Sequence, residues 1–315
     1  MINYKPSIMH VIDSLSIGGA ERMLVDIVNA VDPARYKVSV GVTRSNMALE
    51  NEIIPSISVE KLDRRSRFDL SGFQKLSHLL KDQHVDILHA HGRSTYSFLL
   101  AARKLGFCKQ PIILHDHFGD IEFDNGIPLW FRVLGAKKLT HYIGVYKKLA
   151  EWAKNAGVSE DKISVIENAI DLQRFTKYEA KDMHACFKIP EGKKIGVMVG
   201  NLRYAKGLDL LIQACSTYES EDLPYFVIIG EEIEKDYLNF CRNLLRDLEL
   251  SENFLFLGKQ KYPISYIKGA DFAVLPSRSE SGPLVLIEYL TCGLPFVAFD
   301  VGGVSEKIRD HLPGS

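Results

Sequence analysis

Short apolar runs recur along the chain, separated by stretches long enough for helices. Most of these runs are continuous rather than alternating, which is typical of parallel strands that are buried on both faces of a sheet. The strands predicted in this way span residues 8–12, 38–42, 86–88, 112–114, 141–145, 195–199, 225–229, 254–257, 272–275 and 296–299.

Helical spacing fills the intervals between these runs. The first helix is the clearest, because Leu24, Ile27, Val28 and Val31 recur at i, i+3, i+4 and i+7 before Asp32-Pro33 breaks the pattern. Repeated alternation of strand and helix predicts an α/β fold with doubly wound parallel sheets.

A polar interval near the middle of the chain divides the elements into two sets. Charged residues gather there with Pro190 and Gly192, a composition that favours a junction between domains. We therefore predict an N-terminal Rossmann-like domain at 1–175, a linker at 176–192 and a C-terminal Rossmann-like domain at 193–315. Because Leu312-Pro313-Gly314-Ser315 follows a helical pattern at 304–310 without a further strand, we expect the second domain to be incomplete at its C-terminal end.

The bulk composition narrows the class of protein. Hydrophobic residues make up 46% of the 315 residues and charged residues 25%, as expected for a soluble chain with two cores. A formal net charge of -1 gives no basic footprint for nucleic acid, so nucleic acid is not an expected partner. Five scattered cysteines without a C-x-x-C pair predict reduced thiols and a cytoplasmic location.

Neither export nor membrane spanning is indicated, because no stretch approaches about 18 uninterrupted apolar residues. The basic run Arg64-Arg65-Ser66-Arg67 could contact anionic lipid, which would place the protein peripherally at the inner face of the membrane. The alternative interpretation is an ordinary solvated loop.

The densest cluster of chemistry-bearing residues follows the strand at 272–275. Ser277 to Pro283 form a loop, and Pro283 suits the first turn of a helix that continues to Leu290. A loop and a helix N-terminus at the carboxyl end of a strand form an anion site in α/β folds. Glu280 could reach a sugar and Glu288 a ribose diol, because carboxylate oxygens accept strong hydrogen bonds from hydroxyl groups.

A second cluster, Gly200 to Gly207, follows the strand at 195–199. Arg203 and Lys206 leave that strand end together and could hold a diphosphate. Taken alone, they could equally be two ordinary surface cations. The chain has no D-x-D sequence, so we expect a site without a metal ion, in which these cations and the helix near Pro283 stabilise the departing diphosphate.

The first half contributes two further features. Gly18-Gly19 joins the first strand to the first helix and lets a ligand approach the backbone, but no G-x-G-x-x-G fingerprint of dinucleotide binding occurs. Histidines follow two strands, and we interpret them as polar contacts to sugar or acceptor in a shared crevice. Zinc is the alternative, although no other ligand spacing supports it. The histidines are His89, His91, His115 and His117.

Several motifs together resemble one known family over nearly the whole chain, that of the retaining glycosyltransferases of family 4, which have the two-domain GT-B fold. The motifs are Gly18-Gly19-Ala20-Glu21-Arg22, Asp86-Ile87-Leu88-His89-Ala90-His91, Lys162 to Asp171 with Phe175, Gly200 to Gly207, Phe256-Leu257-Gly258, and Glu280 to Glu288 with Cys292-Gly293-Leu294-Pro295.

The resemblance implies two facing domains and a nucleoside-diphosphate sugar as donor, with no cofactor. It implies retention of configuration and transfer to a glycan or lipid-linked acceptor. The implied catalytic residues are Glu280, at the donor sugar, and His117, beside the transferred sugar. The implied donor-binding residues include Arg203 and Lys206 on the diphosphate, Glu288 on the ribose, and Phe256 and Gly258 at the base. The segment Ser281, Gly282, Pro283 and Leu284 would offer backbone N–H groups to sugar and phosphate, and Gly19 of the first half is also implied to bind the donor.

The chain departs from the family pattern at two motifs. Asn201 stands where the family usually has arginine, so Arg203 substitutes for it by proximity. Glu167-Asn168-Ala169 replaces the usual Pro-Asn-Gly turn. Family members also normally continue into a last strand and a helix that returns to the first domain. Two other functions stay open, a nucleotide-sugar 2-epimerase and a catalytically silent nucleotide-sugar-binding protein.

Overall fold

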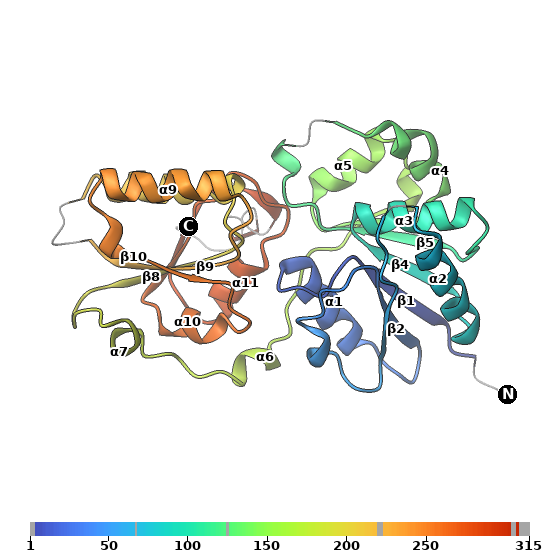
Figure 1. Cartoon of the computed structure of the whole chain (residues 1–315), viewed down its shortest axis with the longest axis horizontal. Coiled ribbons are helices and arrows are strands. Elements are labelled where there is room, and N and C mark those ends of the chain that lie inside the picture. The colour runs from blue at the N-terminus through green and yellow to red at the C-terminus, as the bar shows by residue number, and fades with distance from the viewer. Residues whose placement is uncertain (1–3, 67, 124–125, 219–222, 304–306, 309–315) are drawn as a thin grey trace. The chain divides into compact units, whose positions relative to one another are not determined.

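The chain folds into two compact units, residues 1–168 and 169–315. The structure, a computed structural model, describes residues 4–66, 68–123, 126–218, 223–303 and 307–308. Each unit contains one parallel sheet with helices on its faces (Figure 1). This is the doubly wound α/β architecture predicted from the alternating pattern.

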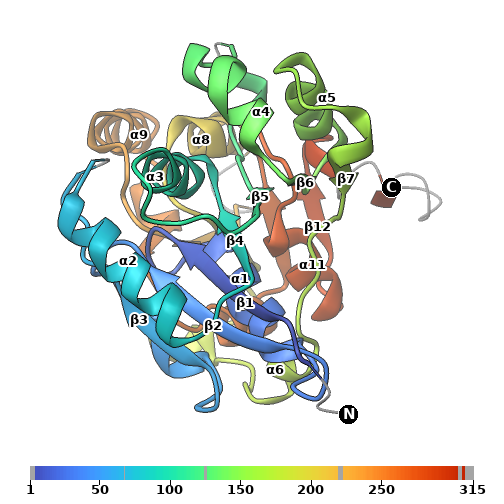
Figure 2. The same ribbon diagram turned by 90° about the vertical axis from the view of Figure 1, so that its right-hand side faces the viewer.

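The described part of the first unit holds a seven-stranded sheet in the order β3-β2-β1-β4-β5-β6-β7, which Figure 2 shows strand by strand. Its elements are β1 (Ser7–Ile12), α1 (Gly19–Ala30), β2 (Lys37–Val42), β3 (Ser58–Lys61), α2 (Leu70–Asp82), β4 (Ile87–His91), α3 (Arg93–Lys104), β5 (Ile112–Asp116), α4 (Ala136–Lys138), β6 (His141–Gly144), α5 (Lys147–Asn155) and β7 (Ile163–Val165).

Alternate residues of the central strands face opposite sides of this sheet. Met9 and Val11 of β1 belong to a large apolar core formed with α2, α3 and α5. Ile12 of the same strand packs with α1 in a second, smaller core that also includes β2. The sheet is therefore covered on both faces, as its continuous apolar runs required.

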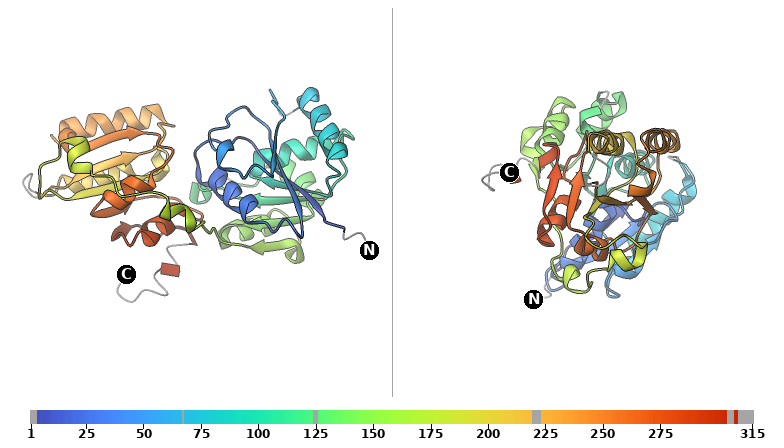
Figure 3. Two further views of the ribbon diagram at one scale, coloured as in Figure 1. Left: turned by 90° about the horizontal axis from the view of Figure 1, so that it is seen from below. Right: turned by 90° about the vertical axis from the view of Figure 1, so that its left-hand side faces the viewer.

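The described part of the second unit holds a five-stranded sheet in the order β10-β9-β8-β11-β12. Figure 3 shows its longest helix, α9, in orange beside the strands. The elements are α6 (Gln173–Thr176), α7 (Met183–Phe187), β8 (Ile195–Val199), α8 (Leu208–Cys215), β9 (Tyr225–Ile229), α9 (Lys235–Asp247), β10 (Phe254–Gly258), α10 (Ile264–Gly269), β11 (Phe272–Leu275), α11 (Leu284–Thr291) and β12 (Phe296–Ala298).

Two apolar cores stabilise this sheet, one on each face. Helices α8 and α9 pack on one face through Ile212 and Leu238. On the other face Met183 of α7, Ile267 of α10 and Leu286 of α11 are buried together. Residues 176–192, predicted as a linker, thus contribute α7 and two buried side chains, Met183 and Ile189, to the second unit.

The structure corrects several predicted bounds. Strands β3 and β7, at the two edges of the first sheet, were not predicted. Strand β4 runs to His91 and β5 to Asp116, so the histidines lie partly within the strands rather than after them. Helix α1 ends at Ala30, and Val31 already has an extended backbone.

Other expectations concern the chain as a whole. None of the described helices combines the length and the apolar character that crossing a bilayer requires. The five cysteines form no disulfide. The expected helical pattern at 304–310 and the chain end at 312–315 lie almost wholly outside the described residues.

Candidate functional site

The strand order of the second unit reverses direction between β8 and β11. The chain runs from β8 through β9 to β10 on one side and then returns to place β11 on the other side of β8. Loops that follow β8 and β11 therefore leave the sheet in opposite directions, and ligands of doubly wound folds bind at such a point. These two loops are the two clusters predicted from the sequence, Gly200 to Gly207 after β8 and Ser277 to Pro283 after β11.

Lys206 and Glu280 meet across this point. The Lys206 ammonium contacts Oε1 of Glu280 directly, and the Ser277 hydroxyl donates to the same oxygen at 2.8 Å. Glu280 is only 4% exposed, so the pair holds a carboxylate and a cation in fixed positions inside the loops. The sequence predicted both residues as site residues but not their contact.

Glu288 has a different cationic partner. It lies on α11, and Nη2 of Arg174 in α6 is 2.8 Å from its Oε1. The two side chains are 10% and 11% exposed, so the carboxylate is held in place by a largely buried guanidinium. Sequence reasoning missed Arg174, although it stands directly before Phe175 in a motif that we had singled out.

An ion pair between the second of these loops and α8 stabilises the loop backbone. Arg278 binds Asp209 of α8 through two nitrogens, at 2.8 and 2.7 Å, and its guanidinium lies 4.1 Å from the centre of the Tyr204 ring. The Tyr237 hydroxyl donates to Asp209 at 2.6 Å. Burial opposes ionisation of this carboxyl, but the hydrogen bonds from Arg278 and Tyr237 outweigh it and lower the pKa of Asp209.

Close backbone packing adds to this rigidity. Gly207 has φ +67°, and a Cβ atom there would lie 1.9 Å from the Pro276 carbonyl oxygen. The Arg278 backbone N–H donates to the Ala205 carbonyl oxygen at 2.8 Å. The two loops thus contact each other through backbone as well as side chains. The close backbone contact requires a glycine at position 207.

The remaining predicted donor residues of this unit are spread over three elements. Ser281, Gly282 and Pro283 are buried before α11, and Leu284 is its first residue. Pro283 therefore precedes the helix rather than lying in its first turn. Phe256 is partly buried on β10, which Gly258 ends at φ +63°. Arg203 directly precedes the short turn Tyr204–Lys206.

In the first unit, a group of imidazole rings occupies the face of the sheet opposite the large apolar core. His89, His91, His115 and His117 are joined there by His10 of β1, which sequence reasoning missed. Burial lowers the pKa of His89 to about 4 and that of His117 to about 3. Burial likewise places the pKa of the other three rings well below the ordinary value, so the whole cluster is neutral at pH 7.

Two other predictions concern the first unit. Gly19 opens α1, and the nearby Glu21 carboxylate accepts hydrogen bonds from Ser14 and Ser16. Arg64 is expected on a solvated loop or at a lipid surface, but its side chain is only 4% exposed and lies 2.5 Å from Asp13. Arg67 lies outside the described residues. The burial of the Arg64 side chain therefore removes one cation from the surface that was expected to contact lipid.

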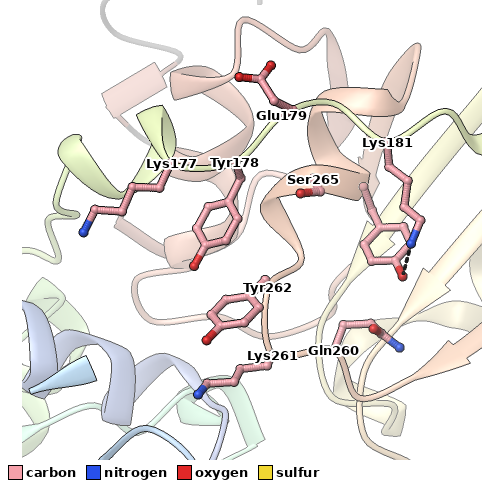
Figure 4. Close-up of a pocket in the computed structure, with 9 residues that line it drawn as sticks. Lys177, Tyr178, Glu179, Lys181, Gln260, Lys261, Tyr262 and Ser265 are labelled. Atoms are coloured by element: carbon pink, nitrogen blue, oxygen red, sulfur yellow. Dashed lines mark hydrogen bonds between the residues drawn. The ribbon is translucent and has the colours of Figure 1, made fainter. Parts of the chain in front are cut away.

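A surface pocket of about 550 Å³ lies elsewhere on the second unit (Figure 4). Tyr178 and Tyr262 stack within it, with ring centres 5.1 Å apart, and the Lys181 ammonium is 3.2 Å from the Tyr266 hydroxyl. None of the site residues predicted from sequence lines it. The predicted chemistry and this pocket are therefore separate features.

The chain matches models of known protein families. A model of "Glycosyltransferase Family 4" matches residues 17–174, and one of "Glycosyl transferases group 1" matches residues 179–315. The chain is 25% identical over 248 residues to N-acetyl-alpha-D-glucosaminyl L-malate synthase of Bacillus anthracis, covering 77% of this chain and 64% of that protein.

Two further matches extend the comparison. UDP-Gal:alpha-D-GlcNAc-diphosphoundecaprenol alpha-1,3-galactosyltransferase of Escherichia coli is 28% identical over 262 residues, covering 78% of this chain and 66% of that protein. The chain thus spans about two thirds of the length of these curated relatives. The crystal structure of Anabaena HepE with UDP and glucose superposes with a TM-score of 0.77 at 21% identity, covering 96% of this chain and 82% of that chain.

Proposed function

The chain belongs to glycosyltransferase family 4, and from that premise we propose that it transfers a sugar from a nucleoside-diphosphate sugar to a glycan or lipid-linked acceptor. Its two Rossmann-like units have the GT-B fold. The observation that carries the proposal is the pair of buried carboxylates, Glu280 and Glu288, each held by its own cation, in the loop and the helix that follow β11.

The donor would bind along the second unit. Glu288, fixed by Arg174, has the acceptor oxygens that a ribose diol needs, and Lys206 and Arg203 supply positive charge for the diphosphate. Phe256 and Gly258 at the end of β10 are the proposed neighbours of the base. Uridine diphosphate is the first nucleotide to test, because the E. coli relative is named for UDP-galactose and the HepE structure contains UDP.

Catalysis would consist chiefly of stabilising the leaving group. Breaking the bond to the sugar places oxocarbenium-like charge on the sugar and negative charge on the diphosphate. Lys206 is already held in place by Glu280, so it needs little rearrangement to meet that charge. We propose that these protein cations make a metal ion unnecessary, that Glu280 and His117 contact the transferred sugar, and that configuration is retained.

Labelled uridine, guanosine and adenosine diphosphate sugars test this function directly. We expect one of them to be transferred or slowly hydrolysed, with turnover falling about a hundredfold in Glu280→Gln because a preorganised charge is lost. Glu252→Gln, which changes an exposed glutamate of the same unit, is the control. An epimerised donor, or binding without turnover in the unaltered protein, would contradict the proposal.

A further inference from the structure

Five histidines of the first unit form one continuous cluster on neighbouring strands. His10 lies opposite His89 in the register of β1 and β4, and His91 lies opposite His115 in that of β4 and β5. His117 follows β5 and lies 4.2 Å from His115 between ring centres. Alternate residues of a strand share a face, so the sheet itself brings these rings together.

The carboxylate that follows His115 in β5, Asp116, is engaged by other residues. Asp116 accepts hydrogen bonds from Arg93 and from the Tyr142 hydroxyl, each at 2.7 Å, through one oxygen. Its other oxygen accepts from the Phe118 backbone N–H at 3.1 Å. Charge pairing with Asp116 therefore does not explain why the histidines gather at this place.

Several ring nitrogens of the cluster lack a hydrogen-bond partner within the described residues. Both nitrogens of His115 are buried and unpartnered, as are Nδ1 of His117 and Nε2 of His89. His115 is only 4% exposed. Buried polar atoms are normally satisfied, and a histidine with neither nitrogen satisfied indicates that a group outside the chain completes the site.

The distances suit a metal ion better than a polar organic ligand. One nitrogen from each of His91, His115 and His117 lies within 4.8 Å of the others, and Nδ1 of His91 is 3.2 Å from Nε2 of His117. Two imidazole nitrogens that bind one tetrahedral zinc ion at about 2.0–2.1 Å are roughly 3.4 Å apart. Small side-chain rotations would aim all three rings at one point.

We propose that His91, His115 and His117 form a binding site for a divalent transition-metal ion, for which zinc is the fitting choice. Neutral imidazole binds zinc, copper and nickel, whereas magnesium and calcium prefer oxygen ligands. Three protein ligands leave the fourth position open to water or another small ligand. The site lies in the first unit and shares His117 with the proposed function, but metal binding is measured without any sugar donor, so the two proposals can fail separately.

His10 gives the proposed site an outer contact. Its Nδ1 is 3.0 Å from Nε2 of His91. If Nε2 of His91 carries the proton and donates to His10, Nδ1 of His91 keeps its lone pair for the metal. Hydrogen bonds of this kind set the tautomer and orientation of ligating histidines.

Metal titration of the full chain tests the proposal. The protein, without a polyhistidine tag and first treated with a chelator, is titrated with Co²⁺ followed by visible absorption and with Zn²⁺ followed by calorimetry. We expect one equivalent to bind, with a tetrahedral Co²⁺ spectrum that Zn²⁺ abolishes. Because these measurements use the unaltered protein, they do not depend on any variant folding.

Variants then locate the ion. His115→Gln and His117→Gln should each weaken Zn²⁺ binding at least tenfold, whereas His78→Gln, at an exposed histidine of α2, should leave it unchanged. Absence of stoichiometric binding to the unaltered protein would overturn the proposal. So would a loss of affinity in His89→Gln but not in His115→Gln, since that would place the ion among His10, His89 and His91.

Discussion

Replacing Arg174 by glutamine tests whether this residue positions Glu288 for the ribose. Arg174 and Glu288 form a largely buried pair at 2.8 Å, and removal of one partner from a buried pair costs about 3–5 kcal/mol. Without its guanidinium partner, the Glu288 carboxylate would no longer be held in position to accept from the ribose. Hydrogen bonds to charged groups contribute about 1.5–3 kcal/mol, so the ribose contact is expected to weaken at least tenfold.

The assay compares uridine diphosphate with its 2′-deoxy analogue by calorimetry. The ratio of the two dissociation constants isolates the ribose contact from the diphosphate and the base. We expect Glu288→Gln and Arg174→Gln to reduce this ratio by similar factors, and Arg174→Lys to restore part of it because it keeps the charge but not the planar fork.

Lys268 of α10 provides the matched control. Its ammonium donates to the carbonyl oxygens of Phe175 and Tyr178, at 2.8 and 2.7 Å, and so anchors the segment that follows Arg174. Lys268→Met should lower stability yet preserve the ratio. If Arg174→Gln keeps the full ratio while Glu288→Gln loses it, Arg174 does not position the carboxylate. If Glu288→Gln also keeps it, Glu288 does not bind the ribose.

Three further variants probe charge, backbone and pH. Lys206→Met should reduce turnover about a hundredfold while weakening donor binding much less, because diphosphate charge grows as the bond breaks; steady-state kinetics with unchanged turnover would remove Lys206 from the site. Gly207→Ala should lower the free energy of unfolding in urea by more than about 2 kcal/mol, since it adds a clash with Pro276 to the strain of a positive φ. Gly293→Ala, at φ +64° in open space, should cost only the strain, and equal losses would refute the clash. Because the pKa of Asp209 is lowered in the folded state, its ionised form stabilises the protein above about pH 4 and that contribution is lost as pH falls further. The difference in unfolding free energy between the unaltered protein and Asp209→Asn should therefore be constant from pH 7 to 5 and shrink below about 4, and a difference that grows on acidification would contradict this.

The central strands were predictable because their consecutive residues are mostly apolar, as burial on both faces of a sheet requires. Ile195–Val199, Tyr225–Ile229 and Phe272–Leu275 have the bounds expected from their apolar runs. The two strands that escaped prediction, Ser58–Lys61 and Ile163–Val165, lie at sheet edges, where one side meets water and polar residues are tolerated. Their pattern therefore resembles that of a loop.

The site was only partly predictable, because sequence signals are local whereas contacts between distant residues depend on the fold. Glu280 and Glu288 have local signals, since each belongs to a loop and helix that follow a strand. Their partners do not, because Arg174 is 114 residues away from Glu288 and only the packed fold determines that they meet. His10 likewise has no local signal, because only the register of β1 and β4 places it beside His89.

The return of β11 to the free side of β8 has a consequence for synthesis of the chain. Strands β8, β9 and β10 can pair as they leave the ribosome, but the other edge of β8 stays unpaired until residues 272–275 arrive. At about 5–20 residues per second, an interval of roughly 70 residues lasts about 4–15 seconds. During that time an apolar strand edge is open to other chains, so this unit is expected to need chaperone protection. Nucleotide binding to a stalled nascent chain should begin only after β11 has emerged.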